Sequence, residues 1–377
     1  MTNNTELTTA YLQFLLDCFW VKGTLVEAET WRSGHINRTY CVTVRTDEGC
    51  RRYVIQAVNS RVFKNIDALM DNAFRVSDYI VHAEAAELGT TPEEAARTEV
   101  HYLLATQGRT YIPGPTGDAW RIYPCIENAA SYLVAETPEL AFEAARTFGR
   151  FQRLLQGLPA RSLFETIPDF HNTPKRFARL AEIAEQDPKG RRKEVEPELK
   201  ALLERAERGG TLQRAHAAGV FPERIAHNDT KMSNVLLDPA TGKGICAIDL
   251  DTVMPGYSVH DFGDLMRTSC NPEEEDTENL DAIQIRYDIF EAITKGFLSE
   301  TKDMFSEEEA LLLPEGGWAM TIENAVRFLT DYLEGDVYFR ISRPDHNLVR
   351  ARAQLAFAQR IEEAMPKLQD IVRKALV

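Results

Sequence analysis

A run of polar residues leads directly into an apolar segment in the second half of the chain. The run is H-N-D-T-K-M-S-N, from His227 to Asn234, and the segment is Val235, Leu236 and Leu237. A surface loop accepts polar residues anywhere, but this loop enters a strand that is expected to be buried, so its side chains are expected to be held in place. Fixed groups of mixed charge indicate a chemical role.

The spacing from Asp229 to Asn234 is D-x-x-x-x-N. At this spacing an aspartate can receive the proton of a substrate hydroxyl while the asparagine holds Mg²⁺ near the phosphates. Lys231 adds a cation where negative charge must be stabilised during transfer. Plain structural roles stay open for single residues, since Asn234 could cap a turn and His227 could pack in a core. Their combination favours the chemical role.

A second acid is expected to complete the metal site, and two candidates follow in the chain. Residues 235–238 and 244–249 flank the turn residues 239–242, which predicts a β-hairpin. Antiparallel strands lie about 5 Å apart, so this hairpin brings Asp249 beside Asn234. Asp261 begins a literal D-F-G, the metal-binding motif of protein kinases, but lies twelve residues further on. The hairpin favours Asp249, with Asp251 as support for a second ion or its waters; hard oxygen donors and nucleotide phosphates suffice for Mg²⁺.

The elements that must position these residues fall into two parts. Residues 1–126 are predicted to form an N-terminal nucleotide-binding lobe, an antiparallel sheet with one long helix at about 65–88. Its expected strands lie at about 25–31, 39–44, 52–58, 101–106 and 120–126. Residues 127–377 are predicted to form a larger, mainly helical C-terminal lobe, with helices at about 138–156, 175–187, 193–218, 279–298, 316–335 and 346–376. The expected fold class is therefore α+β with two lobes.

Composition limits the partners. The 377 residues carry 43 Lys and Arg against 58 Asp and Glu, a formal charge of −15, and no dense basic run, so nucleic acid is not expected as a partner. The opening residues lack a basic region and no apolar run reaches the length of a membrane span, so neither secretion nor a membrane is expected. Six scattered cysteines fit reduced thiols in the cytoplasm. A monomer is the default expectation.

Several motifs together resemble a known family. They are S-G-H-I-N-x-T-Y, H-N-D-T-K-x-x-N, A-I-D-L-D-T, D-F-G-D and R-F-L-x-D-Y-L-E-G-D-x-Y-F, which span nearly the whole chain. They resemble the N-acetylhexosamine 1-kinases of the aminoglycoside phosphotransferase and choline kinase-like superfamily. The resemblance implies a two-lobed protein-kinase-like fold, with ATP and Mg²⁺ as cofactors and a sugar as the second substrate.

The same resemblance implies roles for single residues. Asp229 would be the catalytic base, Asn234 and Asp249 the magnesium ligands, and Asp261 a structural support for the catalytic loop. The sugar would be reached by Arg327 and Tyr338 and by the loop with His35 and Asn37, and His171 matches a family-like stretch that could approach the substrate. Directional donors and an aromatic face suit a polyol. An Arg327 to Asp331 pair on one helix face is the structural alternative.

The nucleotide side departs from the usual kinase pattern. The loop with Ser33 and Gly34 lies where a kinase-like fold covers the phosphates, but it has one glycine where three are usual. Gln56 stands where many kinase-like enzymes carry the lysine that binds the α and β phosphates, and an amide donates a hydrogen bond without charge. The resemblance includes this glutamine. Adenine is expected at the lobe junction around Tyr123, Cys125 and Ile126.

The leading hypothesis is transfer of the γ-phosphoryl group of ATP to the anomeric hydroxyl of an N-acetylhexosamine, either GlcNAc or GalNAc. One alternative is a kinase for another small hydroxyl compound, such as an amino alcohol, homoserine or an aminoglycoside. The acidic residues Asp331, Glu334 and Asp336 keep a cationic acceptor open. A nucleotide-binding scaffold without turnover is the second alternative, suggested by Gln56.

Overall fold

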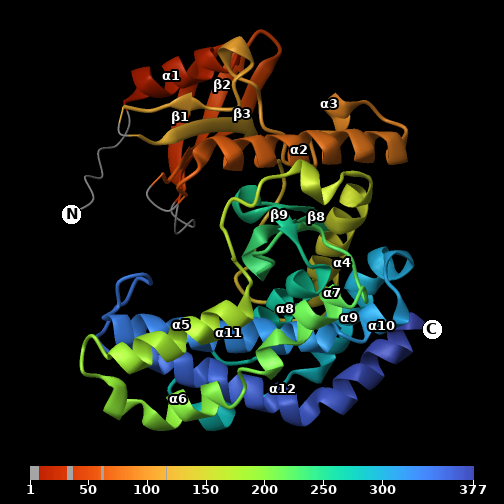
Figure 1. Cartoon of the computed structure of the whole chain (residues 1–377). Coiled ribbons are helices and arrows are strands. Elements are labelled where there is room, and N and C mark those ends of the chain that lie inside the picture. Colours follow the sequence, from red (N-terminus) through yellow and green to blue (C-terminus); the bar gives the residue numbers. More distant parts are fainter. Residues whose placement is uncertain (1–7, 32–36, 61–62, 116) are drawn as a thin grey trace.

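The fold is taken from a computed structural model of the chain, which describes residues 8–31, 37–60, 63–115 and 117–377. The N-terminal part is one antiparallel sheet with the strand order β1-β2-β3-β5-β4. Its strands are β1 (Thr24–Trp31), β2 (Arg38–Thr46), β3 (Gly49–Val58), β4 (Ile112–Pro113) and β5 (Ala119–Pro124). Figure 1 shows this sheet above a larger helical part.

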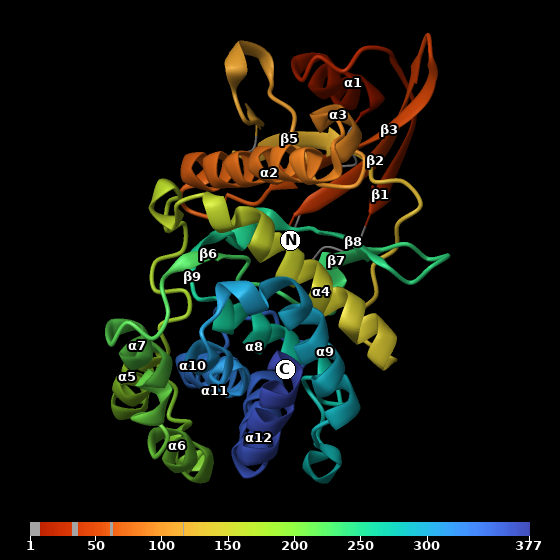
Figure 2. The same cartoon turned by 90° about the vertical axis from the view of Figure 1, so that its right-hand side faces the viewer.

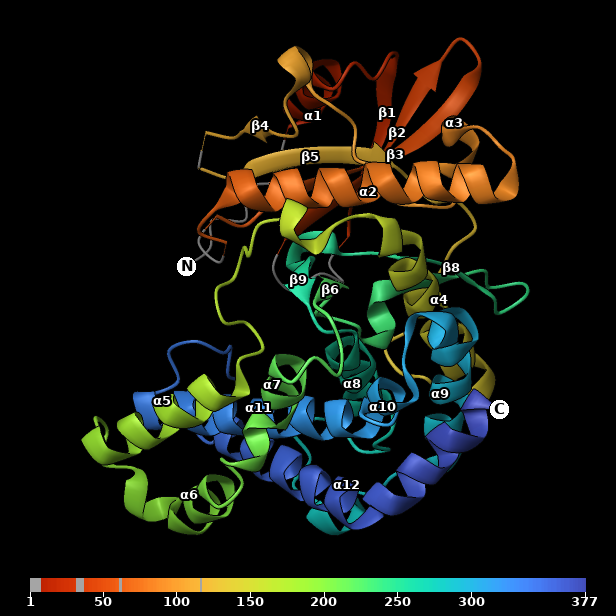
Figure 3. The same cartoon turned by 45° about the vertical axis from the view of Figure 1, so that its right-hand side comes forward.

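Three helices accompany the sheet: α1 (Thr9–Cys18), α2 (Ile66–Leu88) and the short α3 (Pro92–Ala95). The long helix α2 begins where the Asn65 side chain accepts a hydrogen bond from the Ala68 amide and ends at Gly89, whose φ of 65° is left-handed. Figure 3 shows α2 running along β5, between the sheet and the C-terminal part. On the C-terminal side, α2 contacts α4 (Pro138–Leu154) and the turn Leu250–Thr252, so it reaches both parts of the molecule.

The strand predicted at 101–106 is wrong. The Leu103 amide donates to the Ile122 carbonyl at 2.9 Å, but the chain then turns through a 3-10 segment at Thr106–Gly108, in which Gln107 has a φ of 64°. Because of this turn, residues 101–106 leave β5 before they can form the row of backbone hydrogen bonds of a strand. Apolar alternation alone did not reveal it.

The C-terminal part is built from α4 (Pro138–Leu154), α5 (Thr173–Gln186), α6 (Glu196–Leu203), α7 (Thr211–Ala217), α8 (Ser258–Ser269), α9 (Tyr287–Thr301), α10 (Glu307–Ala310), α11 (Leu313–Glu334) and α12 (His346–Leu376). Figure 2 shows α5, α6 and α7 on one side of α11 and α12, with α9 on the other. The helix predicted at 193–218 is broken into α6 and α7, and the one predicted at 279–298 begins only at Tyr287. Among the described residues, no helix is long and apolar enough to cross a membrane.

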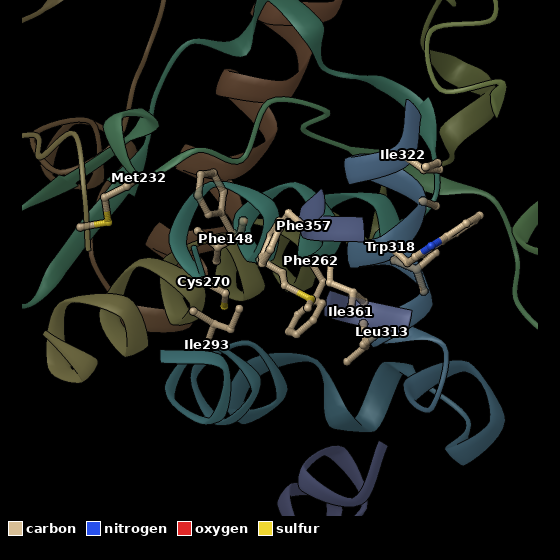
Figure 4. Packing of buried hydrophobic residues seen from close by; sticks show 14 of the residues in the cluster. Phe148, Met232, Phe262, Cys270, Ile293, Leu313, Trp318, Ile322, Phe357 and Ile361 are labelled. Carbon is tan, nitrogen blue, oxygen red and sulfur yellow. The ribbon is translucent and has the colours of Figure 1, made fainter. Parts of the chain in front are cut away.

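The core of the C-terminal part lies between α4, α8, α9, α11 and α12. Phe148, Phe262, Ile293 and Phe357 are at most 1% exposed and pack together there (Figure 4). The rings of Phe262 and Phe297 meet edge to face at 5.6 Å. This core fixes α8 and α11, the two helices that carry site residues.

Two short sheets lie between the core and the N-terminal part. The predicted hairpin is confirmed as β7 (Val235–Leu237) paired with β8 (Gly244–Ala247), and β6 (Arg224–Ala226) pairs with β9 (Met254–Gly256). Figures 2 and 3 show β6 and β9 beneath α2. The α+β class, with an antiparallel sheet followed by a mainly helical part, is confirmed.

Candidate active site

The loop after β6 is anchored by the aspartate of the literal D-F-G. Asp261 is 1% exposed and accepts hydrogen bonds from the backbone amides of His227 and Asn228, both at 2.8 Å. The Gln152 side chain donates to the same carboxylate at 2.6 Å. Both oxygens are therefore used inside the protein, and Asp261 holds the loop in place.

The first two residues of the loop face inward. The imidazole of His227 lies 3.0 Å from the Ile248 carbonyl and packs against Phe148 and Phe151. Asn228 has a φ of 63°, and its side chain donates to the Thr252 carbonyl at 2.9 Å. This left-handed turn is a conformation that asparagine tolerates better than most residues. It ties the loop to the segment after β8.

Asp229, the predicted base, is held by two neighbours. Its Oδ2 accepts from Lys231 Nζ at 2.7 Å and from Asn234 Nδ2 at 2.8 Å. Burial disfavours the charged carboxylate, but Lys231 and the hydrogen bonds outweigh this effect and lower the pKa of Asp229 below its ordinary value. Its side chain keeps 30% of its exposure, so an ionised carboxylate is accessible to a substrate.

Asn234 and Asp249 meet across the hairpin as predicted. The Ile248 amide donates to the Asn234 carbonyl at 2.9 Å, which places Asp249 next to Asn234. Because Asn234 uses its amide nitrogen on Asp229, its Oδ1 is the side-chain atom left for a metal. Burial and the charges of Asp251 and Asp229 raise the pKa of Asp249 to about 7. This convergence of hard oxygen donors fits a Mg²⁺ ion, whose charge would offset the repulsion.

Asp251 is engaged by two groups of the N-terminal part. Its Oδ1 lies 2.5 Å from Nη1 of Arg121, and its Oδ2 accepts from Asn37 Nδ2 at 2.6 Å. Arg121 also donates through Nε and Nη2 to Gln56 Oε1, at 3.0 and 2.9 Å. Asn37 thus contacts Asp251 directly, and Gln56 is linked to it through Arg121. Residues 249–251 carry the predicted metal ligands and are named the metal segment. The metal role of Asp251 stays a prediction.

The predicted adenine segment joins β5 to the C-terminal part. Tyr123 is half-buried and meets Tyr102 edge to face at 5.4 Å, and Cys125 and Ile126 are nearly buried. The Cys125 amide donates to the Arg52 carbonyl at 2.9 Å, so this group already has a partner. The predicted phosphate and sugar residues Ser33, Gly34 and His35 lie outside the described residues.

Arg327 lies among aromatic rings. Its guanidinium carbon is 5.3 Å from the ring centre of Phe339 and 5.9 Å from those of Phe170 and Tyr338. Within the described ranges, no carboxylate lies within ion-pair distance of it, and it donates only to Asn324 Oδ1 at 3.5 Å. The predicted pair Arg327 and Tyr338 is brought together, while the alternative pair with Asp331 is not formed.

Asp331 instead shapes the loop that carries the aromatic residues. Its side chain accepts from the backbone amides of Val337, Tyr338 and Phe339 at 2.8 to 3.0 Å. The two other acids of the predicted acidic run are also engaged: Asp336 pairs with Arg191 at 2.7 Å, and Glu334 pairs with Arg179. The acidic run therefore serves the structure of the loop.

His171 links the loop of residues 227–234 to α11. Its Nδ1 lies 3.0 Å from Glu323 Oε1 and its Nε2 lies 3.4 Å from the Asn228 carbonyl. Burial opposes ionisation of Glu323, but His171 beside it lowers the pKa of this acid to about 2. A cavity of about 140 Å³ opens next to His171, with Tyr257 and His260 also in its wall. The Nε2 of the 3% exposed His260 has no hydrogen-bond partner among the described residues.

The buried His260 is expected to make the protein acid-sensitive. Burial, with the nearby His171, lowers its pKa to about 3, whereas an unfolded histidine titrates near about 6.5. Protonation of His260 therefore favours the unfolded chain. Above about pH 6.5 the histidine is neutral in both states and costs no stability. Below about pH 6.5 the free energy of unfolding falls by about 1.4 kcal/mol per pH unit.

Urea unfolding between pH 7 and pH 4 measures the effect. In both His260→Phe and His260→Asn, the free energy of unfolding should depend less steeply on pH than in the unchanged protein. The slope should fall by about 1.4 kcal/mol per pH unit, the contribution of one proton. Because the two variants differ in packing and polarity, a shared slope change reports titration. If the free energy of unfolding changes with pH in the same way in all three proteins, His260 does not control the loss of stability in acid.

Sequence reasoning missed Arg121, Glu323 and the role of Asp331. The first had a readable signal, because an arginine inside the apolar strand A-W-R-I-Y is unusual and needs a partner. Glu323 contacts His171, more than a hundred residues away in the chain, and Asp331 accepts from the backbone amides of residues 337–339. No local sequence pattern encodes these contacts.

The fold and the grouping of Asp229, Asn234 and Asp249 around one hairpin define a kinase-like phosphotransferase. Residues 27–295 match the APH phosphotransferase enzyme family, and the chain belongs to this family. The broader part of the predicted resemblance is thereby confirmed.

Solved structures support the fold across the whole chain. A spectinomycin phosphotransferase in complex with ADP and spectinomycin has a TM-score of 0.55 at 11% identity, covering 96% of this chain and 100% of that one. Choline kinase from Cryptosporidium parvum has a TM-score of 0.51 at 15% identity and 93% coverage of both chains. Plasmodium vivax ethanolamine kinase has a TM-score of 0.51 at 12% identity, with 94% and 96% coverage. Such low identities establish the fold alone.

Proposed function

We propose that this protein transfers the γ-phosphoryl group of ATP to the anomeric hydroxyl of an N-acetylhexosamine and forms the sugar 1-phosphate. The observation that carries the kinase part is the ionised Asp229, held by Lys231 and Asn234 beside Asp249. ATP is proposed to bind between the sheet and the hairpin, with adenine near the Tyr123 to Ile126 segment.

Asp229 is proposed to receive the acceptor proton. As the acceptor oxygen bonds to the γ-phosphorus, the bond from that phosphorus to the β-phosphate oxygen breaks and ADP leaves. An anomeric hydroxyl is more acidic than an ordinary alcohol, which suits a carboxylate of low pKa. Lys231 keeps a positive charge near the transferred group. Mg²⁺ held by Asn234 and Asp249 would neutralise phosphate charge.

The Arg327 environment supports a neutral polyol as acceptor. The Arg327 guanidinium pairs with no carboxylate of the described residues, so it has donors to offer to carbonyl and hydroxyl oxygens. The rings of Phe170, Tyr338 and Phe339 suit the CH face of a sugar. The same positive charge disfavours a cationic acceptor. His171 is proposed to position the adjoining loop through its contact with the Asn228 carbonyl.

A cationic acceptor is the second candidate, because the cavity beside His171 has acidic residues in its wall. Glu165 and Glu223 are exposed carboxylates there, next to the aromatic ring of Tyr257. Carboxylates with an aromatic wall are what an ammonium group binds. This candidate predicts an amino alcohol or an aminoglycoside as substrate.

Phosphorus NMR separates the candidates. The protein is incubated with ATP and Mg²⁺ in parallel tubes that contain N-acetylglucosamine, N-acetylgalactosamine, choline, homoserine or an aminoglycoside. We expect a new phosphate resonance coupled to an anomeric proton in at least one hexosamine tube. A product only in a tube with a cationic compound would replace the sugar assignment by the second candidate, and ATP consumption in none of them would overturn both.

We also propose that the reaction takes place in the cytoplasm. All six cysteines are free, and Cys41, Cys125, Cys246 and Cys270 are buried. The thiols of Cys41 and Cys125 are close enough to share a hydrogen bond, yet they form no disulfide. Unpaired, buried thiols fit a reducing compartment.

A further inference from the structure

The strongest unexplained feature is a buried charge that joins the two parts of the molecule. Arg121 on β5 is 0% exposed, and its guanidinium also lies over the ring of Tyr102 at 4.6 Å. A buried guanidinium is costly unless each side of it is satisfied. Here one side faces Asp251 at 2.5 Å and the other faces Gln56 at 2.9 to 3.0 Å.

Gln56 and Arg121 are opposite each other in the β3 and β5 register. Side chains of directly opposed residues point to the same face of a sheet, so a lysine at position 56 would place a second cation against the Arg121 guanidinium. The glutamine oxygen instead accepts two hydrogen bonds from Arg121, and its nitrogen donates to Thr39 Oγ1 at 3.3 Å. The unusual glutamine is thus matched to the arginine on the neighbouring strand.

Asp251 connects this pair to the metal segment. It lies two residues after Asp249, in the 3-10 turn Leu250–Thr252, and is 4% exposed. Its second oxygen accepts from Asn37, whose own Oδ1 accepts from the Asn59 amide at 3.2 Å. Arg121 on β5 and Asn37 just before β2 therefore fix, from the N-terminal part, the backbone turn that follows Asp249.

We propose that Arg121 is a positioning residue that couples the N-terminal sheet to the metal segment through Asp251, and that Gln56 serves as its acceptor. Arg121 supplies, from β5, the buried positive charge that other kinase-like enzymes place on β3. Because it is fully buried and its guanidinium faces Asp251 and Gln56, it acts on the nucleotide only through the position of Asp249. This inference rests on the proposed function for the nucleotide and metal but not for the acceptor.

The test measures ADP binding by calorimetry, once with Mg²⁺ and once with EDTA, so that no acceptor is needed. The readout is the factor by which Mg²⁺ strengthens ADP binding. We expect Arg121→Gln to reduce this factor about tenfold, a typical size for a residue that orients a metal ligand. ADP affinity in EDTA should stay within about twofold of the unchanged protein, because Arg121 does not touch the nucleotide.

The paired variants decide between coupling and independent roles. Gln56→Lys alone should also reduce the Mg²⁺ factor, because it sets two cations side by side. The double variant Gln56→Lys with Arg121→Gln should recover most of it, because one buried cation again faces Asp251. Losses that add in the double variant would overturn the proposal, and so would an equal loss with and without Mg²⁺, which would indicate direct contact with the phosphates.

Two further variants separate positioning from folding. Arg205→Gln removes a two-bond contact with Glu362 at 2.8 Å in the C-terminal helices and should leave the Mg²⁺ factor unchanged. If thermal melting shows Arg121→Gln to be unfolded, Gln56→Leu replaces it, since that variant keeps the ion pair with Asp251 and removes only the acceptor. It should reduce the factor about threefold, and an unchanged factor would overturn the coupling. If the unchanged protein does not bind ADP at all, the proposed function is contradicted instead.

Discussion

Replacing Asp229 with asparagine is expected to lower kcat by about a thousandfold, the usual contribution of a positioned base. The amide has nearly the same shape, and its oxygen can still accept from Lys231 and Asn234, as the carboxylate does at 2.7 and 2.8 Å. What is lost is the ability to take up the acceptor proton. Nucleotide binding should persist, because Asp249 and Asn234 are unchanged.

Initial rates from a coupled ADP assay and calorimetry with ADP and Mg²⁺ measure both parts of this prediction. Asp238→Asn is the matched control, since it makes the same chemical change on the same hairpin, where the side chain accepts from the Ala240 amide at 2.8 Å within the turn. The control should keep normal turnover. Turnover retained by Asp229→Asn would remove its role as base and direct attention to Asp249 and Asp251.

The proximity of Asn234 and Asp249, the predicted metal ligands, could be predicted because its determinants are local. Asn234 and Asp249 are joined by one hairpin, so the strand pattern and the antiparallel spacing were enough to place them together. The same reasoning favoured Asp249 over the aspartate of the literal D-F-G, and the family resemblance implied a structural role for Asp261, which holds the amides of His227 and Asn228. A motif match alone would have proposed Asp261 as the metal ligand, although its carboxylate oxygens already accept hydrogen bonds inside the protein.

The environment of Gln56 could not be predicted because it depends on pairing between distant strands. Arg121 lies sixty-five positions away in the chain, and only the β3 and β5 register makes the two residues neighbours. Asp331 shows the same limit in another form. As a charge it suggested a helix-face pair or a cation site, whereas its oxygens hold the backbone amides of a loop. Sequence gives the residue type but not which polar group satisfies it.

Gly263, in the same D-F-G, is expected to tolerate no side chain, because α8 packs closely against α11 at this position. A Cβ added there would lie 2.3 Å from the Gly316 carbonyl oxygen and 2.4 Å from its carbon, so α8 and α11 would have to separate. Helix propensity alone would favour Gly263→Ala by about 1 kcal/mol. Overpacking against backbone costs about 3 kcal/mol and outweighs that gain. We expect a lower free energy of unfolding by about 2 kcal/mol in urea titrations.

Gly157→Ala separates this effect from the general effect of adding a methyl group. Its added Cβ would also meet an atom at 2.3 Å, but that atom is the hydroxyl of Tyr79, at the end of a side chain that can move. Gly157 is exposed, and its substitution should change stability by less than about 0.5 kcal/mol. Because α8 carries Asp261 and α11 carries Arg327, separation of the two helices should also lower kcat in Gly263→Ala. Equal stability of the two variants would contradict the predicted cost of overpacking between α8 and α11. An unchanged kcat in Gly263→Ala would show that the spacing of the two helices does not set the positions of Asp261 and Arg327.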